Sequence, residues 1–258
     1  NKHYSDYGQK ALEENPKLIE DLYTDYINLG SNYITTFNYG FKPYNDSKWE
    51  YYTKKSVDIM QKFRSDKVKV LGSIPPFFKS YQYSDVNDKF IDFYEKLVNI
   101  FKNNVDYYLV ETSISYKHVL KIYEIIKKID PNTKLIISLY PNQDSYKNIN
   151  KYLDLEFHGL FLNCCKFNEV VKFYNQNLKL SNKVFGFYCN KIDEKKYYNN
   201  NNDIKNLKNY QTKDEINGEN LKEFLNTTNL NEVFIGGCCG YGVKEMKVLI
   251  EMINEINF

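Results

Sequence analysis

The sequence predicts an α/β fold of the (β/α)8 TIM barrel class, and three observations lead to this expectation. Helical and strand-like segments alternate along almost the whole chain, which requires a parallel sheet with right-handed crossovers. The strand-like segments are short and rich in β-branched and aromatic residues, as buried strands are. No glycine-rich phosphate loop follows an early strand, and this disfavours a doubly wound open sheet. A chain of 258 residues fits one barrel domain, 1–258.

The first elements are defined by their end signals. Segment 16–29 carries apolar residues at helical spacing, with Asn15 as its N-cap and Gly30 just beyond its end. Segment 33–37 reads YITTF and predicts a short buried strand. By the same patterns, further strands are expected at 68–74, 106–111, 135–139, 159–164, 184–188 and 233–236. Further helices are expected at 48–64, 88–103, 116–129, 146–153, 168–178, 217–227 and 244–256, the third of these being stopped by Pro131.

These elements are one strand short of a complete barrel. Seven strands and eight helices are predicted, and the chain opens on a helix rather than a strand. We therefore expect the first strand to lie upstream of Asn1 or to be lost. The polar segment 191–213, which contains the asparagine run 199–202, is expected to be a surface insertion rather than a domain boundary.

Composition excludes several classes of partner. The formal charge is +2, and only Arg64 of the 35 basic residues is an arginine, so neither nucleic acid nor an anionic membrane is an expected partner. No apolar stretch is long enough to span a bilayer, and no signal-peptide pattern opens the chain. Five clustered cysteines are too few for a secreted disulfide scaffold. We expect a cytoplasmic protein, with no prediction for its oligomeric state.

Three cysteines stand where barrel strands end. Cys164 closes segment 159–164, and Cys238 and Cys239 follow segment 233–236. The carboxyl ends of barrel strands open onto one face, so these thiols should converge there. Three thiolates suit Zn²⁺ and leave its fourth position open. Single free cysteines are more often small core residues, but the adjacent pair lies in GGCCGYG, whose glycines indicate a sharply bent backbone.

These motifs resemble a known family. GGCCG after the last strand and GxxxNC at 159–164 are similar to the zinc-dependent homocysteine S-methyltransferases, as are segments 15–39, 70–74 and 92–113. That family includes S-methylmethionine- and betaine-dependent enzymes and the homocysteine module of cobalamin-dependent methionine synthase. The resemblance implies Zn²⁺ on Cys164, Cys238 and Cys239, with homocysteine and a methyl donor as substrates. It also implies that Glu111 contacts the homocysteine amino group.

Further site residues are predicted from their positions on the strand rims. Thr36, Ser73 and Thr112 are candidates for hydrogen bonds to the substrate, although hydrogen bonds to neighbouring backbone are an equal alternative. Asn163 is expected to point to the opposite side of its strand from Cys164, as a supporting or packing residue. Cys189 ends the strand between the two ligand strands and could approach the metal. Cys165 is expected to be a small buried residue.

Three functions follow from these observations. The leading hypothesis is zinc-dependent transfer of a methyl group from S-methylmethionine or a related donor to the homocysteine thiol, giving methionine. The alternative is a degenerate zinc-binding barrel without this activity, because the family's Asp-Gly-Gly motif has no counterpart after Asn1 and Pro75-Pro76 alters a substrate loop. A thiol redox enzyme ranks last, because adjacent cysteines form a strained disulfide.

Overall fold

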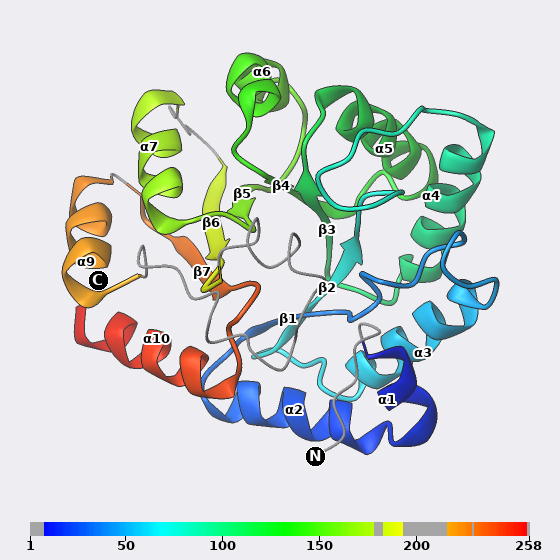
Figure 1. Cartoon of the computed structure of the whole chain (residues 1–258), viewed down its shortest axis with the longest axis horizontal. Helices are drawn as coiled ribbons and strands as arrows, with labels where there is room; N and C mark the ends of the chain where they lie inside the picture. The colour runs from blue at the N-terminus through cyan, green and yellow to red at the C-terminus, as the bar shows by residue number, and fades with distance from the viewer. Residues whose placement is uncertain (1–7, 178–182, 193–215, 229, 257–258) are drawn as a thin grey trace.

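Seven parallel strands curl into a half-barrel with the helices outside it (Figure 1). The computed structural model describes residues 8–177, 183–192, 216–228 and 230–256. Each strand pairs with the next along the chain, in the order β1-β2-β3-β4-β5-β6-β7. The predicted barrel class is therefore confirmed, as a TIM barrel that lacks one strand within the described residues. Of the insertion predicted at 191–213, only residues 191 and 192 are described.

The observed elements follow the predicted alternation closely. The strands are β1 (Tyr33–Thr35), β2 (Lys69–Ile74), β3 (Tyr107–Ser113), β4 (Lys134–Leu139), β5 (Gly159–Asn163), β6 (Val184–Cys189) and β7 (Val233–Gly237). The described helices are α1 (Gln9–Glu14), α2 (Lys17–Asn28), α3 (Trp49–Gln61), α4 (Asp88–Phe101), α5 (Tyr116–Ile129), α6 (Gln143–Leu153), α7 (Phe167–Asn177), α9 (Gly218–Thr227) and α10 (Val243–Ile256). Helix α1 was not predicted, because six residues that bury only Ala11 and Leu12 carry no readable periodicity.

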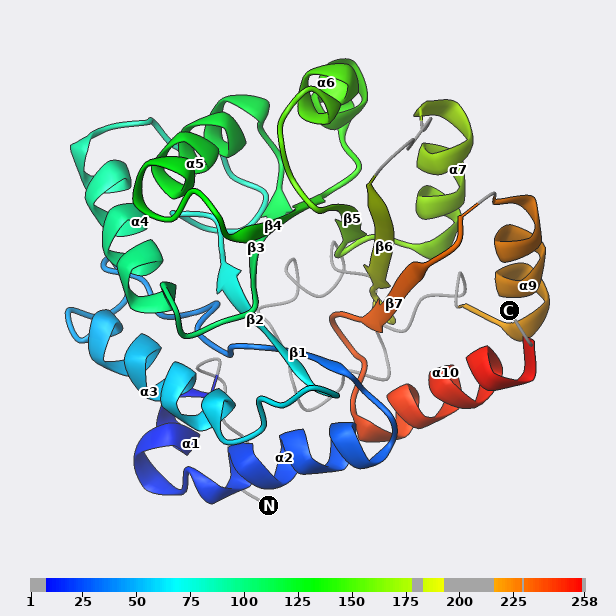
Figure 2. The ribbon, with the colours of Figure 1, turned by 180° about the vertical axis from the view of Figure 1, so that it is seen from behind.

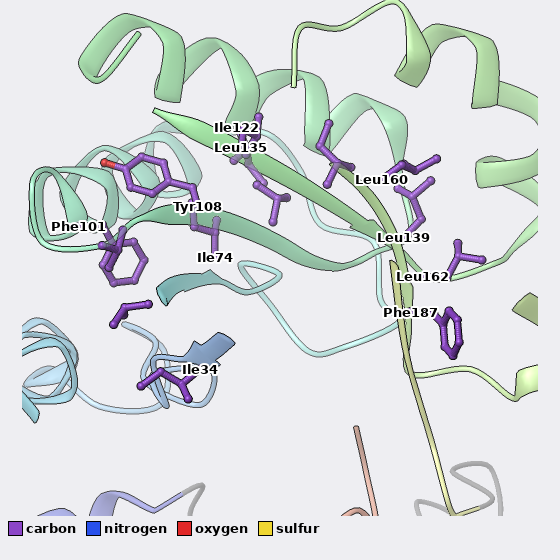
Figure 3. Close-up of a cluster of buried hydrophobic side chains, with 14 of the residues drawn as sticks. Ile34, Ile74, Phe101, Tyr108, Ile122, Leu135, Leu139, Leu160, Leu162 and Phe187 are labelled. Carbon is purple, nitrogen blue, oxygen red and sulfur yellow. The ribbon is translucent and has the colours of Figure 1, made fainter. Parts of the chain in front are cut away.

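The two faces of the sheet have different roles. Outward side chains pack against the helices in the main core, where Tyr108, Leu160 and Phe187 are almost fully buried (Figure 3). Inward side chains form a small apolar layer inside the barrel, made of Leu71, Tyr107, Leu109, Ile136 and Phe161. Two positions further along the same strands stand Ser73, Glu111, Ser138 and Asn163, all buried. Strand alternation therefore places a polar layer at the carboxyl end of the barrel, above an apolar base.

The ends of the half-barrel approach each other. Tyr33 on β1 and Phe234 on β7 have ring centroids 4.5 Å apart, so aromatic packing links the two outermost strands at the base. Helices α2 and α10, from opposite ends of the sequence, are in contact on the outside of β1 and β7 (Figures 1 and 2). None of the described helices is long and apolar enough to cross a membrane.

Candidate metal centre

Three thiols meet at the carboxyl end of the barrel. The Sγ atoms of Cys164 and Cys238 are 3.0 Å apart, and all three Sγ atoms of Cys164, Cys238 and Cys239 lie within 4.8 Å of one another. Cys164 is buried, whereas Cys238 and Cys239 are partly exposed. The structure thus brings together the three predicted ligands, from chain segments 74 residues apart.

Backbone geometry turns these thiols toward one another. Cys164 follows β5 with φ of 54°, a left-handed conformation that few residues other than glycine adopt. Beyond β7, the Cys238 amide donates to the Cys189 carbonyl at 2.7 Å, and the Cys239 amide donates to Oδ1 of Asn190 at 3.1 Å. Gly240 then reverses the chain with φ of 88°. These three residues, 238–240, form the cysteine loop, and its hydrogen bonds hold it against the end of β6.

Asn163 is the polar hub beside the thiols. Its Nδ2 donates to Sγ of Cys164 at 3.2 Å and to Oγ1 of Thr112 at 2.9 Å. Its Oδ1 accepts from the Thr112 amide at 3.0 Å and from Oγ of Ser138 at 2.7 Å. The prediction that Asn163 points away from Cys164 was wrong, because the left-handed backbone at Cys164 breaks the alternation of the strand. Its predicted supporting role agrees with these contacts.

Glu111 is a buried carboxylate next to this cluster, only 9 % exposed. Oγ of Ser73 donates a short hydrogen bond to Oε1, and the Tyr188 hydroxyl donates to Oε2 at 3.4 Å. Burial raises the pKa of Glu111 to about 7, against the lowering effect of the Ser73 hydrogen bond. The Glu111 carboxyl therefore lies buried beside the thiols without a cation in direct contact among the described residues. Tyr188 was not predicted here; its inward position on β6 was the available signal.

Thr112 lies at an irregularity in β3. Its φ of 53° is strained for a β-branched residue, and the pairing of β3 with β4 shifts register between Val110 and Ser113. This distortion directs Oγ1 of Thr112 to within 3.8 Å of Sγ of Cys164. Strained non-glycine residues concentrate at functional sites, and here two of them, Thr112 and Cys164, are in contact.

The other predicted substrate contacts already have protein partners. Thr36 donates from Oγ1 to Oδ1 of Asn38 at 2.7 Å and accepts from the Ser73 amide at 2.8 Å. The Ser73 hydroxyl proton is engaged by Glu111. Thr36 and Ser73 are buried. Their hydrogen bonds link the ends of β1, β2 and β3 beneath the site.

The chemistry of the three thiols fits zinc. The Cys238 hydrogen bond lowers the pKa of Cys164, but the Cys239 contact and burial outweigh it and give a pKa of about 12. The Cys164 and Cys239 thiols raise the pKa of Cys238. Hydrogen bonds between neutral thiols are weak, whereas a divalent cation would stabilise all three groups as thiolates. The three closely spaced sulfur donors therefore match the ligand type that zinc prefers in proteins.

The two remaining cysteines and the histidines of the described residues are not part of this metal-binding group. Cys165 and Cys189 are both buried in the main hydrophobic core and contact each other. Cys165 is thus the small buried residue that was predicted, and Cys189 is not part of the metal-binding group in the described residues. His118 on α5 contacts the Ser84 carbonyl at 2.6 Å and is not among the residues of the metal-binding group.

Comparison of the sequence with protein-family models identifies the family of this chain. The family model described as homocysteine S-methyltransferase matches residues 2–253. The chain belongs to the homocysteine S-methyltransferase family. A search of curated proteins finds no match to the chain.

Solved structures that resemble this family member show the same fold. The homocysteine methyltransferase MmuM from Escherichia coli, in its metallated form, aligns with a TM-score of 0.73 at 15% identity, over 97% of this chain and 90% of that chain. Its oxidized form aligns with a TM-score of 0.71 at 16% identity, over 96% and 89% of the two chains. Its apo form gives a TM-score of 0.68 at 17% identity, over 94% and 88%. At such low identity the likeness concerns the barrel itself.

Proposed function

We propose that this homocysteine S-methyltransferase family member transfers a methyl group from a small-molecule donor to the thiol of homocysteine, giving methionine. The observation that carries the proposal is the convergence of Cys164, Cys238 and Cys239 beside the buried carboxylate of Glu111. A metal-binding thiol cluster accounts for one end of homocysteine, and a buried carboxylate accounts for the ammonium at the other. Free cysteines suit a reducing compartment, so we place the reaction in the cytoplasm.

Cys164, Cys238 and Cys239 would hold Zn²⁺ and leave one coordination position for substrate. When bound, zinc would supply a Lewis acid that keeps a thiol ionised at neutral pH. Asn163 orients Cys164 through its 3.2 Å hydrogen bond to Sγ, and Asn190 holds the Cys239 amide. Both contacts fix the geometry of the thiols before substrate arrives.

The chain's other residues would align the amino acid. Glu111 would accept hydrogen bonds from the homocysteine ammonium. These bonds would compensate the buried carboxylate for the loss of its hydrating water. Ser73 and Tyr188 fix the orientation of the carboxylate. The homocysteine thiol releases its proton to solvent, and the sulfur then attacks the donor methyl carbon. A new C–S bond forms, and the electron pair of the broken bond leaves with the donor heteroatom. Alignment of the two reactants would contribute much of the rate.

We propose S-methylmethionine or a related onium compound as the donor. Tyr81 contacts Cys164, and its ring lies 4.9 Å from that of Tyr140, so aromatic rings border the thiols. Aromatic faces attract sulfonium and quaternary ammonium groups. A sulfonium donor also leaves as a neutral thioether, which needs no protonation by the protein.

The test begins with zinc content, followed by zinc X-ray absorption with and without L-homocysteine. We expect about one zinc per chain in three-sulfur coordination, with a fourth sulfur when homocysteine is added. Methionine formation is then measured with S-methylmethionine, betaine and methylfolate. Zinc that does not respond to homocysteine would support the degenerate barrel instead. A chain without zinc that cycles between thiol and disulfide would support the redox enzyme.

A further inference from the structure

Lys42 is a buried cation that the proposed function does not use. It lies between β1 and α3, at the same end of the barrel as Glu111, and is only 3% exposed. Its Nζ donates to the Phe78 carbonyl at 2.8 Å and lies 5.0 Å from the ring centroid of Tyr39. An ammonium group has three N–H donors, so the carbonyl satisfies only one of them.

Within the part of the chain that the structure describes, Lys42 has no anionic partner in direct contact. Among the described residues, no aspartate or glutamate forms an ion pair with it, and Glu111 acts on it only as a nearby charge. Burial lowers the pKa of Lys42 to about 8. A buried lysine is normally paired, because removing an ammonium from water without compensation is costly. The missing partner is therefore expected to be an anion that binds here.

The surroundings connect Lys42 to the thiol site. The Tyr39 ring that faces Lys42 carries a hydroxyl bonded to Oγ of Ser80 at 2.6 Å, and this hydroxyl also contacts Thr112. Thr112 in turn lies beside Cys164. Tyr39 thus stands between the ammonium and the thiols. A ligand that reaches both ends must be a small molecule with separate anionic and sulfur-containing groups.

The hydroxyl groups near Lys42 could donate to a bound anion only by giving up a hydrogen bond that they already make. Thr36 donates to Asn38 and Ser73 donates to Glu111, so both hydroxyl protons are already engaged. Thr112 accepts from Asn163 and contacts Tyr39. Lys42 retains donor capacity, and it carries the charge that a carboxylate prefers.

We propose that Lys42 is the cationic group that binds a substrate carboxylate in this site. This assignment rests on the proposed function, in which Glu111 takes the ammonium of the amino acid. Homocysteine carries its carboxylate on the same carbon as that ammonium, and S-methylmethionine carries one as well. Either carboxylate would make the same contact with the Lys42 ammonium, and the experiment distinguishes homocysteine from S-methylmethionine.

The experiment uses the zinc-loaded full chain, with Lys42→Met and the matched variant Lys48→Met, which removes an exposed lysine from the same segment. Calorimetry measures binding of L-homocysteine and of 3-mercaptopropylamine, which keeps the thiol and ammonium but lacks the carboxylate. We expect Lys42→Met to weaken homocysteine binding roughly 10- to 100-fold, with little change for the amine. Lys48→Met should match the wild type.

A second arm tests the donor. The KM values of S-methyl-L-methionine and trimethylsulfonium are compared in the wild type and in Lys42→Met. A KM increase confined to S-methylmethionine, with homocysteine binding unchanged, supports the donor carboxylate as the partner. Lys42→Arg keeps the charge and should keep the preference for carboxylate-bearing ligands, and Lys42→Gln replaces Lys42→Met if that variant does not fold.

Two results overturn the assignment. Equal weakening of homocysteine and 3-mercaptopropylamine would show that Lys42 only supports the fold. If Lys42→Met still prefers homocysteine to 3-mercaptopropylamine and S-methylmethionine to trimethylsulfonium as strongly as the wild type does, Lys42 does not contact either carboxylate. These outcomes leave the proposed function standing, whereas a zinc-loaded wild type that binds no homocysteine would overturn the proposed function and this assignment together.

Discussion

Asn163 holds Thr112 by two hydrogen bonds, although β4 lies between the strands that carry these residues. Oδ1 accepts from the Thr112 amide at 3.0 Å, and Nδ2 donates to its Oγ1 at 2.9 Å. The same amide bonds Ser138 on β4 and Sγ of Cys164. One side chain therefore joins three strands and supports the two residues with left-handed backbones, Thr112 and Cys164.

Replacing Asn163 by alanine should release this network. Thr112 and Ser138 would lose buried partners, so we expect the free energy of unfolding to fall by about 2–4 kcal/mol. Zinc affinity should fall roughly 10- to 100-fold, because Cys164 loses its orienting donor. Urea denaturation and competition with a zinc chelator measure the two effects. Asn148→Ala, on the partly buried surface of α6, is the control. Unchanged zinc affinity in a folded Asn163→Ala protein would contradict the positioning role.

Replacing Cys238 by serine should remove stoichiometric zinc. Two thiolates hold zinc much more weakly than three, and the serine hydroxyl is not ionised at neutral pH. Metal content after dialysis, measured by mass spectrometry, checks this expectation. Cys189→Ser is the matched control, because this buried cysteine lies outside the metal-binding group and should leave the zinc content unchanged. Full zinc occupancy in Cys238→Ser would show that the ligand set is different.

The stability of the metal-free protein should depend on Glu111. Burial raises its pKa to about 7 from an ordinary 4.5, so the folded state holds this proton more tightly than the unfolded state. The resulting stabilisation is complete below pH about 4.5 and is lost as the pH rises through about 7. Over that interval, the free energy of unfolding should fall by about 3 kcal/mol more in the wild type than in Glu111→Gln. Denaturation at a series of pH values measures this difference.

An exposed glutamate provides the control for that titration. The Glu156 side chain is 87% exposed, so Glu156→Gln should keep the slope of the wild type. If Glu111→Gln also keeps it, Glu111 is ionised in the folded protein across this pH range.

Replacing Gly240 by alanine should disturb the cysteine loop. Its φ of 88° is strained for alanine, and a Cβ atom there would lie 2.9 Å from Cγ2 of Ile192. We expect a loss of about 1–3 kcal/mol in the free energy of unfolding, together with weaker zinc binding. Gly218→Ala tests the opposite case, since nothing lies within 4 Å of its Cβ position at the start of α9. That control should be neutral or stabilising by up to about 1 kcal/mol in thermal denaturation. Normal zinc binding by Gly240→Ala would mean that the loop tolerates another conformation.

The order of elements could be predicted from sequence because each element has a local signal. The α5 helix occupies 116–129, the predicted range, since its apolar spacing and Pro131 define both its face and its end. The three thiols were predicted to converge for an equally simple reason: barrel topology sends the carboxyl ends of all parallel strands to one face.

Other features depend on contacts between distant segments. Alternation along β5 would direct Asn163 and Cys164 to opposite faces, but φ of 54° at Cys164 brings both into the site. Lys42 carries no motif, and only folding buries it beneath the Phe78 carbonyl and beside Tyr39. Residue types and strand order thus determined which groups reach the barrel mouth. Tertiary structure decided which of them are buried, paired or left with unused donors, because burial and hydrogen-bond partners are set by segments far apart in the chain.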